Sequence, residues 1–217
     1  MRRTHAAPLI TRPRSMASSP TPAPGKSFKA SRRLMTAALA SSLAGDVFLM
    51  FPGQFIAGLV SFLLAHLCYL GVFRLDVPWF PQRGALAATL AVGAGMYAFL
   101  WANGLPAALR GPVAAYVLVI AFMAAQAMGR ASVMGGRGAW MVAAGAAFFM
   151  LSDSLLATNR FARDLPMASF WVLSTYYAAQ VLIVWGWLQE HAATAARPGA
   201  GNGTHQGGPV EEPAGLY

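Results

Sequence analysis

Charged residues are scarce in this chain of 217 residues, and acidic residues are scarcer than basic ones. The chain has 7 Asp and Glu against 16 Lys and Arg, charged residues make up 11% of the sequence, and hydrophobic residues make up 57%. A soluble globular domain usually has about 25% charged residues. The composition therefore excludes an ordinary soluble domain and indicates a membrane protein.

The chain also lacks the features of a secreted protein held together by disulfides. Its one cysteine, Cys68, has no partner within the chain and lies in an apolar stretch, where it acts as a small hydrophobe. The first 33 residues are basic and rich in Pro and Ser, without the apolar core of a secretory signal peptide. We expect residues 1–33 and 192–217 to be disordered tails on either side of a helical domain at 34–188.

Six long runs with almost no charge lie between these tails. Each run is long enough to cross the hydrocarbon core of a membrane as a helix. The runs lack the two-residue alternation of a membrane β-barrel, and backbone groups in lipid must be satisfied within their own segment. We therefore predict an all-α, polytopic transmembrane helix bundle. The six predicted spans are residues 34–51, 55–73, 84–103, 112–128, 140–158 and 168–188.

The basic residues are distributed unevenly around the predicted spans. Eight of the sixteen precede the first span, and most of the others fall in connections on the same side of the membrane. Short connections on the cytoplasmic side carry an excess of Lys and Arg. We therefore expect a multi-pass protein of a bacterial plasma membrane with both termini in the cytoplasm. Because topology explains the net charge of +9, we expect no binding to nucleic acid.

Three acidic or basic side chains lie inside the spans, namely Asp46, His66 and Asp153. With a rise of 1.5 Å per residue, the two aspartates lie about 7 to 8 Å below the same face of the membrane. A carboxylate at the hydrocarbon centre costs about 2.5 to 3.5 kcal/mol on insertion scales, so a chain that keeps one usually has a use for it. Two carboxyl groups at matched depth predict a functional site.

Further polar side chains lie deeper on the neighbouring spans. His66 and Gln180 fall about 16 to 18 Å below the same face. Tyr69 follows His66 by three residues, and Tyr176 and Tyr177 precede Gln180 by one helical turn, so each helix directs its polar groups to one side. We expect four helices to contribute to one polar pocket that opens outward. For any one of these residues alone, a hydrogen bond that merely fastens two helices is the alternative.

Two blocks of sequence that contain these residues resemble the YhhN family, whose characterised members are lysoplasmalogenases. The first block is SSLAGDVFLMFPGQFIAGLVSFLLAHLCYLGVF, and the second is GAAFFMLSDSLLATNRF followed by STYYAAQVLI. The resemblance covers residues 34 to about 188. The family has eight helices, so the resemblance implies that the first two are absent from this chain, and a chain that truly lacks them is expected to have impaired activity. The matching positions are Ser42, Gly45, Asp46, Phe55, Gly58, Phe62, His66, Tyr69, Ser152, Asp153, Phe161, Tyr176, Tyr177 and Gln180.

The resemblance implies an ether hydrolase that cleaves the sn-1 vinyl ether bond of a lysoplasmalogen and releases a fatty aldehyde and a glycerophospho-base. The substrate is a lysophospholipid, and the expected partners are this substrate and the membrane lipid around the protein. Acid protonates the alkene, and water traps the resulting oxocarbenium ion. Two carboxyl groups divide related work in glycosidases, so Asp46 and Asp153 are the expected catalytic pair. Arg160 is a candidate to meet the substrate phosphate, and a plain anchor at the membrane interface is the alternative. The residues expected to bind or orient substrate or water are His66, Tyr69, Ser152, Tyr176, Tyr177 and Gln180.

Two other functions remain open from the sequence. Paired carboxylates inside a membrane also serve transporters and ion pathways, although no span has the central proline of a broken helix. A non-catalytic membrane protein that binds lipid is the other alternative. We expect no cofactor and no metal, because no cluster of His, Asp and Glu has the spacing of metal ligands. The sequence indicates no oligomeric state.

Overall fold

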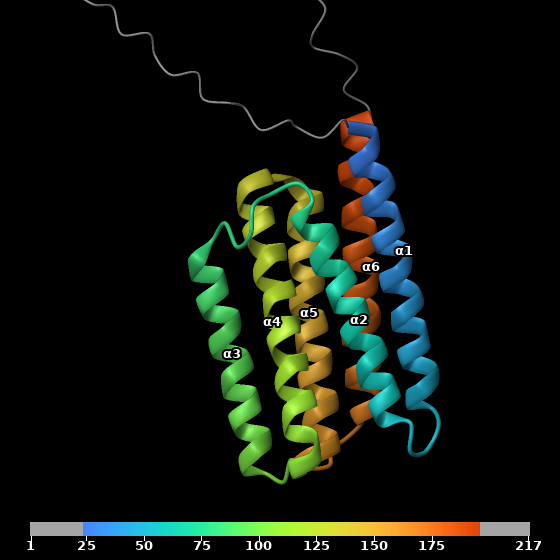
Figure 1. Ribbon diagram of the computed structural model, residues 1–217, viewed down its shortest axis with the longest axis vertical. Coiled ribbons are helices and arrows are strands. Elements are labelled where there is room, and N and C mark those ends of the chain that lie inside the picture. Colours follow the sequence, from blue (N-terminus) through green and yellow to red (C-terminus); the bar gives the residue numbers. More distant parts are fainter. Residues whose placement is uncertain (1–23, 196–217) are drawn as a thin grey trace, which may run out of the picture.

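The computed structural model describes residues 24–195, and this part of the chain is helical apart from its connections (Figure 1). Six helices follow one another, and the described residues contain no strand. The predicted all-α bundle of six helices is confirmed. The helices are α1 (Pro24–Leu49), α2 (Phe55–Arg74), α3 (Arg83–Ala102), α4 (Ala107–Met134), α5 (Gly136–Phe161) and α6 (Ala168–Ala195).

The helices lie where the apolar runs predicted them. α2 and α3 differ from the predicted spans by at most one residue at either end. α4 and α5 extend beyond the predicted spans at both ends. The prediction ended each span near the first polar or charged residue, whereas a helix continues into the membrane interface, where such residues are solvated or, like Arg130, paired with acidic side chains.

The expectation of a disordered tail at residues 1–33 is wrong for its last part, because α1 begins at Pro24. Proline suits the first turn of a helix, where its missing N–H is not needed. The first turns of α1 pack on the end of α6. The ring of Phe28 stacks on that of Trp187 with centroids 6.2 Å apart, and the Trp187 indole N–H donates to Ser31 over 2.8 Å. These long-range contacts order a segment that looks unstructured by composition.

The expectation of a second disordered tail, at residues 192–217, begins too early. α6 continues to Ala195, and the ring of His191 packs 4.4 Å from the ring of Trp187, measured between centroids. The expectations for residues 1–23 and 196–217 lie outside the described part of the chain.

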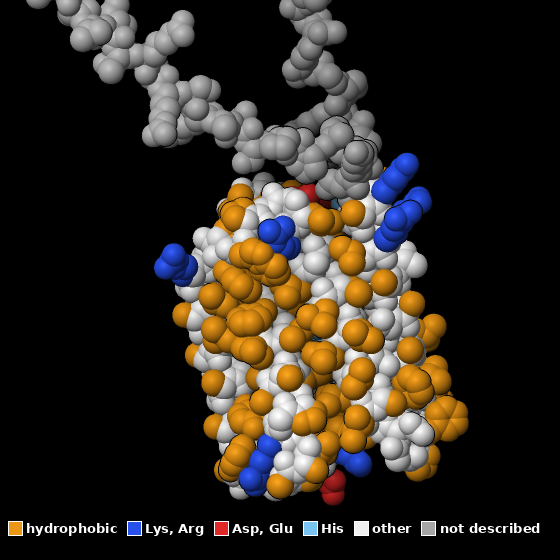
Figure 2. Space-filling view, in the orientation of Figure 1, with side chains coloured by type: hydrophobic (Ala, Val, Ile, Leu, Met, Phe, Trp, Pro, Cys, Tyr) orange, Lys and Arg blue, Asp and Glu red, His pale blue; other side chains and the backbone are white. Residues whose placement is uncertain are grey.

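Five of the described helices, α2 to α6, are long and apolar enough to cross a membrane by length and composition. α1 is not among them, because Lys29, Arg32 and Arg33 occupy its first part and its apolar run begins only at Leu34. That α1 crosses the membrane stays a prediction. Figure 2 shows hydrophobic side chains over the middle of the visible face, with Lys and Arg side chains towards both ends. This distribution suits a bundle whose middle faces hydrocarbon.

The helices pair as three hairpins, α1–α2, α3–α4 and α5–α6. α4 also packs on α2 and α5, whereas α3 and α1 lie towards opposite edges of the bundle in Figure 1. The connections 50–54, 103–106 and 162–167 lie together at the lower end of Figure 1, which we call the site end. The opposite end, where the described chain begins and finishes, is the terminal end.

Glycines bring α5 and α6 into close contact. A Cβ atom on Gly138 would lie 2.7 Å from the carbonyl oxygen of Gly186, and one on Gly186 would lie 2.6 Å from the carbonyl oxygen of Gly138. Near the middle of the pair, a Cβ atom on Gly145 would lie 2.8 Å from the carbonyl oxygen of Ala179. Small residues let membrane helices approach in this way, so that backbone packing holds the pair together.

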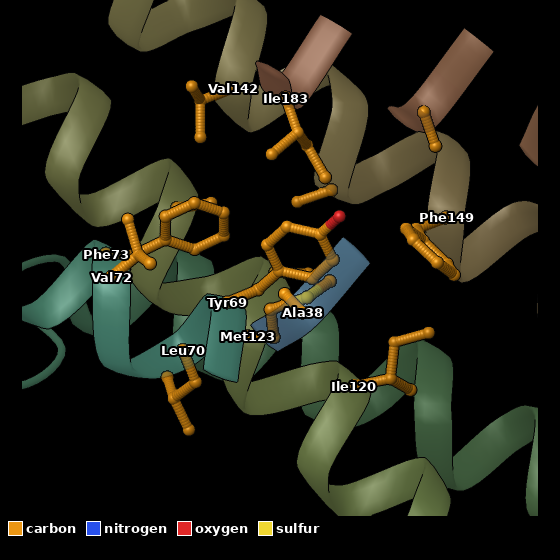
Figure 3. Close-up of a cluster of buried hydrophobic side chains, with 14 of the residues drawn as sticks. Ala38, Tyr69, Leu70, Val72, Phe73, Ile120, Met123, Val142, Phe149 and Ile183 are labelled. Atoms are coloured by element: carbon orange, nitrogen blue, oxygen red, sulfur yellow. The ribbon is translucent and has the colours of Figure 1, made fainter. Parts of the chain in front are cut away.

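Aromatic side chains separate this hairpin from α1 and α2. Among the described residues, no Cα atom of α2 lies within 8 Å of one in α5 or α6. The gap is filled by rings: Phe149 and Tyr176 have centroids 5.5 Å apart, and Phe62 and Tyr176 have centroids 5.9 Å apart. Figure 3 shows Tyr69 inside this cluster, surrounded by side chains from α1, α4, α5 and α6. The polar groups of the candidate site lie along this aromatic layer.

The close contact of α5 and α6 predicts that Gly145→Ala lowers the melting temperature of the protein in detergent. The added methyl group meets the Ala179 carbonyl oxygen at 2.8 Å and Ile183 Cγ1 at 2.7 Å. Overpacking of this kind typically costs about 1 to 3 kcal/mol. The matched control is Gly95→Ala on α3, where a Cβ atom meets nothing within 4 Å. The control should leave the melting temperature unchanged or slightly higher, since Ala favours helix. Equal effects of the two changes would contradict the prediction.

Candidate active site

Asp153 lies near the site end of α5 and is held by a tyrosine from another helix. The hydroxyl group of Tyr116, in α4, donates a hydrogen bond to Asp153 Oδ2 over 2.6 Å. Only 15% of the Asp153 side chain is exposed. A carboxyl group in an apolar bundle needs such a donor, because an unsatisfied buried polar group is costly. The Tyr116 bond therefore fixes both the position of the carboxyl group and the packing of α4 against α5.

His66, in α2, lies directly behind Asp153. Its Nε2 atom is 3.7 Å from Asp153 Oδ2, which is too long for a hydrogen bond. The imidazole is fully buried, edge-on to the rings of Phe149 and Tyr116 at centroid distances of 4.6 and 5.3 Å. Among the described residues, neither ring nitrogen makes a hydrogen bond of standard geometry, and the backbone of Phe62, one turn earlier in α2, is a weaker partner. A small shift of either side chain would join the imidazole to the carboxyl group.

Asp46, in α1, ends a chain of hydrogen bonds that starts in the aromatic core. Tyr69 donates to the Gln180 side-chain oxygen, and Gln180 Nε2 donates to the Tyr176 hydroxyl over 3.2 Å. The Tyr176 hydroxyl in turn donates to Asp46 Oδ2 over 2.8 Å. Every hydrogen bond in this chain is donated in the direction of Asp46. The Asp46 carboxyl group is therefore the final acceptor. The chain connects α2 and α6 to α1.

The two aspartates line the same cavity. It has a volume of about 520 Å³ and lies between α1, α5 and α6 at the site end, where Met50 and Ser169 form part of its wall. Tyr176 also faces it. The described residues contain no group of three or more His, Cys, Asp or Glu side chains placed to hold a metal ion. The cavity thus offers two carboxyl groups, which are suited to proton transfer and to stabilising a positive charge.

Most of the predicted site residues line the cavity, and the others lie behind it or at its rim. Ser152 and Tyr177 line the cavity, and Tyr177 is 59% exposed. The Ser152 hydroxyl donates to the carbonyl oxygen of Val172 over 3.0 Å, so it also fastens α5 to α6. His66, which we expected beside the aspartates in one pocket, does not line the cavity. Tyr69 and Gln180 do not line it either, and they reach it through Tyr176.

Arg160 lies outside the cavity that contains the aspartates. It is exposed at the end of α5, with its guanidinium carbon 5.3 Å from the centre of the Phe55 ring. It lines a neighbouring hollow of about 460 Å³ around the 50–54 connection. Leu49 and Leu156 line both hollows. Arg160 therefore stands at the rim of the site rather than in it.

Tyr116 is the site residue that the sequence analysis missed. A signal was present, because Tyr116 follows the start of the predicted span 112–128 by four residues, or about 6 Å. That depth matches the depth predicted for Asp153. The sequence favours a pocket between the four helices that contain charged or clustered polar residues. At the depth of Asp153, α4 has only an isolated tyrosine, so α4 was not expected to contribute. Depth alone would have found it.

Two further buried polar residues, both in α4, lie away from the site. Gln126 accepts a hydrogen bond from the backbone N–H of Phe80 over 2.8 Å and fastens the connection between α2 and α3. Arg130 is buried at the terminal end of the bundle. It donates to Glu190 over 2.7 Å and to Asp76 over 2.9 Å. These groups fix the bundle opposite the site end.

Comparison with known proteins identifies relatives along most of the chain. The model of the YhhN family matches residues 15–187. Human lysoplasmalogenase TMEM86B is 36% identical over 151 residues, which are 70% of this chain and 62% of that protein. The mouse lysoplasmalogenase TMEM86B is 39% identical over 162 residues, 75% of this chain and 65% of that protein.

A bacterial relative is also similar. The lysoplasmalogenase of Mycobacterium tuberculosis is 32% identical over 177 residues, 77% of this chain and 66% of that protein. The chain thus spans slightly less than two thirds of the length of these curated relatives. No solved structure matches the chain.

The hydrogen bond between Tyr116 and Asp153 predicts an energetic coupling between these residues. In a double-mutant cycle with Tyr116→Phe and Asp153→Ala, we expect a coupling of about 0.6 kcal/mol or more, up to about 1.7 kcal/mol, the average and the maximum for polar pairs inside a membrane protein. The measurement is the free energy of unfolding in mixed micelles. Asp46→Ala is the matched control, because Asp46 bonds to Tyr176 and not to Tyr116. The cycle of Tyr116→Phe with Asp46→Ala should show a coupling near zero, and equal couplings in both cycles would refute the pairing.

Proposed function

The chain belongs to the YhhN family and is an integral membrane protein, and on this basis we propose that it hydrolyses the sn-1 vinyl ether bond of lysoplasmalogens. The products are a fatty aldehyde and a glycerophospho-base. The observation that carries the proposal is the pair of carboxyl groups, Asp46 and Asp153, that line one cavity in an apolar bundle. The names of relatives in human, mouse and mycobacterium support the same activity.

The first step is protonation of the alkene. The π electrons of the vinyl ether form a bond to a proton at the carbon β to oxygen, and a lone pair of the ether oxygen completes an oxocarbenium ion. One carboxylic acid of the pair supplies the proton. The other carboxyl group, ionised, stabilises the cation, and this attraction is stronger in the poorly hydrated interior of the bundle than in water.

The second step is the addition of water. Water attacks the oxocarbenium carbon and gives its proton to the carboxylate that protonated the alkene, which restores the acid. The resulting hemiacetal collapses when its hydroxyl proton moves to the glycerol oxygen and the bond between carbon and that oxygen breaks. Glycosidases use two carboxyl groups in the same manner around a transition state with oxocarbenium character. The reaction consumes one water and needs no cofactor.

The neighbouring polar groups hold the two carboxyl groups in place. Tyr116 fixes Asp153, and the chain from Tyr69 through Gln180 to Tyr176 fixes Asp46. We assign His66 to orienting Asp153, and Ser152 and Tyr177 to shaping the cavity around the substrate. Arg160, at the rim, is placed to meet the phosphate of the lysophospholipid headgroup, for which a guanidinium is a good partner.

We also propose that the protein lies in the plasma membrane and that both of its termini face the cytoplasm. The support is the distribution of basic residues among the described helices and connections. Lys29, Arg33, Arg74, Arg83 and Arg137 lie towards the terminal end, and an excess of such residues marks the cytoplasmic side. The site end then faces away from the cytoplasm.

Replacing either aspartate by asparagine tests the catalytic pair. Asp46→Asn and Asp153→Asn keep an acceptor for the tyrosine hydroxyl but remove the acidic proton and the negative charge. Each change should lower kcat for release of fatty aldehyde by a hundredfold or more, on the order of the usual contribution of an acid or base. The assay is aldehyde release from a purified lysoplasmalogen. Asp164→Asn, in the exposed connection before α6, is the matched control and should keep full activity.

His66→Gln should reduce activity less than either asparagine change, because a neutral amide can partly replace an imidazole whose proposed role is orientation. The melting temperature of each variant is measured beside its activity. Full activity in Asp46→Asn or Asp153→Asn would exclude the mechanism. A parallel loss of melting temperature and activity would instead favour a purely structural role for that aspartate.

A further inference from the structure

A second, apolar crevice next to the polar cavity also has Asp153 in its wall. It runs between α2, α3, α4 and α5, and its volume is about 70 Å³. Its wall includes Phe55, Gly93, Val117 and Ala157, and Asp153 is the one ionisable carboxyl group in it. At about 10 to 15 Å³ for each water-sized sphere, this space holds about five such spheres. The crevice is therefore small, and its wall is almost entirely apolar apart from Asp153, Tyr116 and Ser154.

Two other hollows share wall residues with the crevice. Phe62, Asp153 and Leu156 line both the crevice and the polar cavity. At the other end, Met96 and Met150 line both the crevice and a groove of about 640 Å³ between α3 and α5. The wall of that groove is mainly apolar, with Val92 and Phe99 among its exposed side chains. The three hollows are therefore neighbours, and the crevice with Asp153 in its wall shares residues with both the polar cavity and the groove.

We propose that this crevice binds the alkenyl chain of the substrate, with the headgroup in the polar cavity and the vinyl ether at Asp153. A lysophospholipid changes from polar to apolar at the bond between its glycerol and its chain. The walls of the neighbouring hollows change from polar to apolar at Asp153. Matching the two places the alkene carbon beside Asp153 and lets the rest of the chain pass Met96 into the groove.

This placement divides the roles of the two carboxyl groups. Asp153 meets the first carbons of the chain, so it is the group that protonates the alkene. Asp46 lines the polar cavity but not the crevice, so it is the carboxylate that faces the oxocarbenium carbon from the side of the headgroup and water. The proton leaves Asp153 for the β carbon and returns to Asp153 from the attacking water. The assignment of chemistry to Asp153 rests on the proposed vinyl ether hydrolysis, whereas chain binding in the crevice does not.

The first test compares lysoplasmalogens with the same headgroup and two chain lengths. The short chain has about five carbons, about the number of water-sized spheres that the crevice holds. The long chain extends to about 15 Å, which is half the thickness of the hydrocarbon core. Met96→Trp narrows the exit from the crevice to the groove. We expect it to lower the ratio of kcat/KM for the long chain to kcat/KM for the short chain tenfold or more. Ala94→Trp, at an exposed position of α3 that lines neither hollow, should leave the ratio within twofold of the unchanged protein.

The second test detects chain binding without catalysis. The probe is a saturated 1-O-alkyl lysophospholipid with a diazirine about four carbons from the ether. It is bound to the full chain in micelles and irradiated, and the labelled residues of the protein are identified by mass spectrometry. We expect labelling of crevice residues such as Gly93, Val117 and Ala157, and less labelling in Met96→Trp. Labelling confined to lipid-facing residues, or a chain-length ratio that Met96→Trp leaves unchanged, would overturn the inference. Crevice labelling in a protein that releases no aldehyde would instead refute the proposed hydrolysis and leave chain binding in place.

Discussion

A carboxyl group inside an apolar bundle must be given a hydrogen-bond donor, and in this protein tyrosines supply that donor from neighbouring helices. Tyr116 of α4 bonds to Asp153 of α5, and Tyr176 of α6 bonds to Asp46 of α1. The second bond joins helices whose described Cα atoms do not come within 8 Å of one another. Long aromatic side chains reach across that distance, and this explains why the layer between the hairpins is built from rings. The same layer carries the hydroxyl groups that hold the site together.

The position of the cavity suits a lysophospholipid better than an ion. Both aspartates lie near the site end, and the polar groups in the middle of the bundle, His66 and Tyr69, are fully buried against Phe149 and its apolar neighbours (Figure 3). An ion pathway needs polar groups or water across the whole thickness, and transporters commonly have helices broken near mid-membrane. The described helices run without such a break. A lipid with a polar headgroup and an apolar chain, in contrast, meets a polar cavity at the end of the bundle and an apolar crevice beside it.

The sequence predicted the helices and the depth of the carboxyl groups, because both follow from one-dimensional properties. Charge-free runs define helices, and a fixed rise per residue gives depth, so Asp46 and Asp153 could be placed in one layer. The partners of these groups depend on which helices are adjacent and how each is rotated, and a single sequence does not contain that information directly. Tyr116 was missed for this reason, and His66 was expected in the cavity although it lies behind Asp153. The start of α1 at Pro24 was missed because contacts with Trp187, more than 150 residues away in sequence, order that segment.

The central claim is that the protein cleaves a vinyl ether by protonating its alkene from a fixed carboxyl group. The most direct measurement is hydrolysis of a lysoplasmalogen by the purified protein in D₂O, with analysis of the aldehyde by mass spectrometry and NMR. A carboxyl group held on one side of the alkene predicts one deuterium on the carbon next to the aldehyde, delivered to a single prochiral face. An aldehyde without that deuterium, or with the label divided equally between the two faces, would contradict the account.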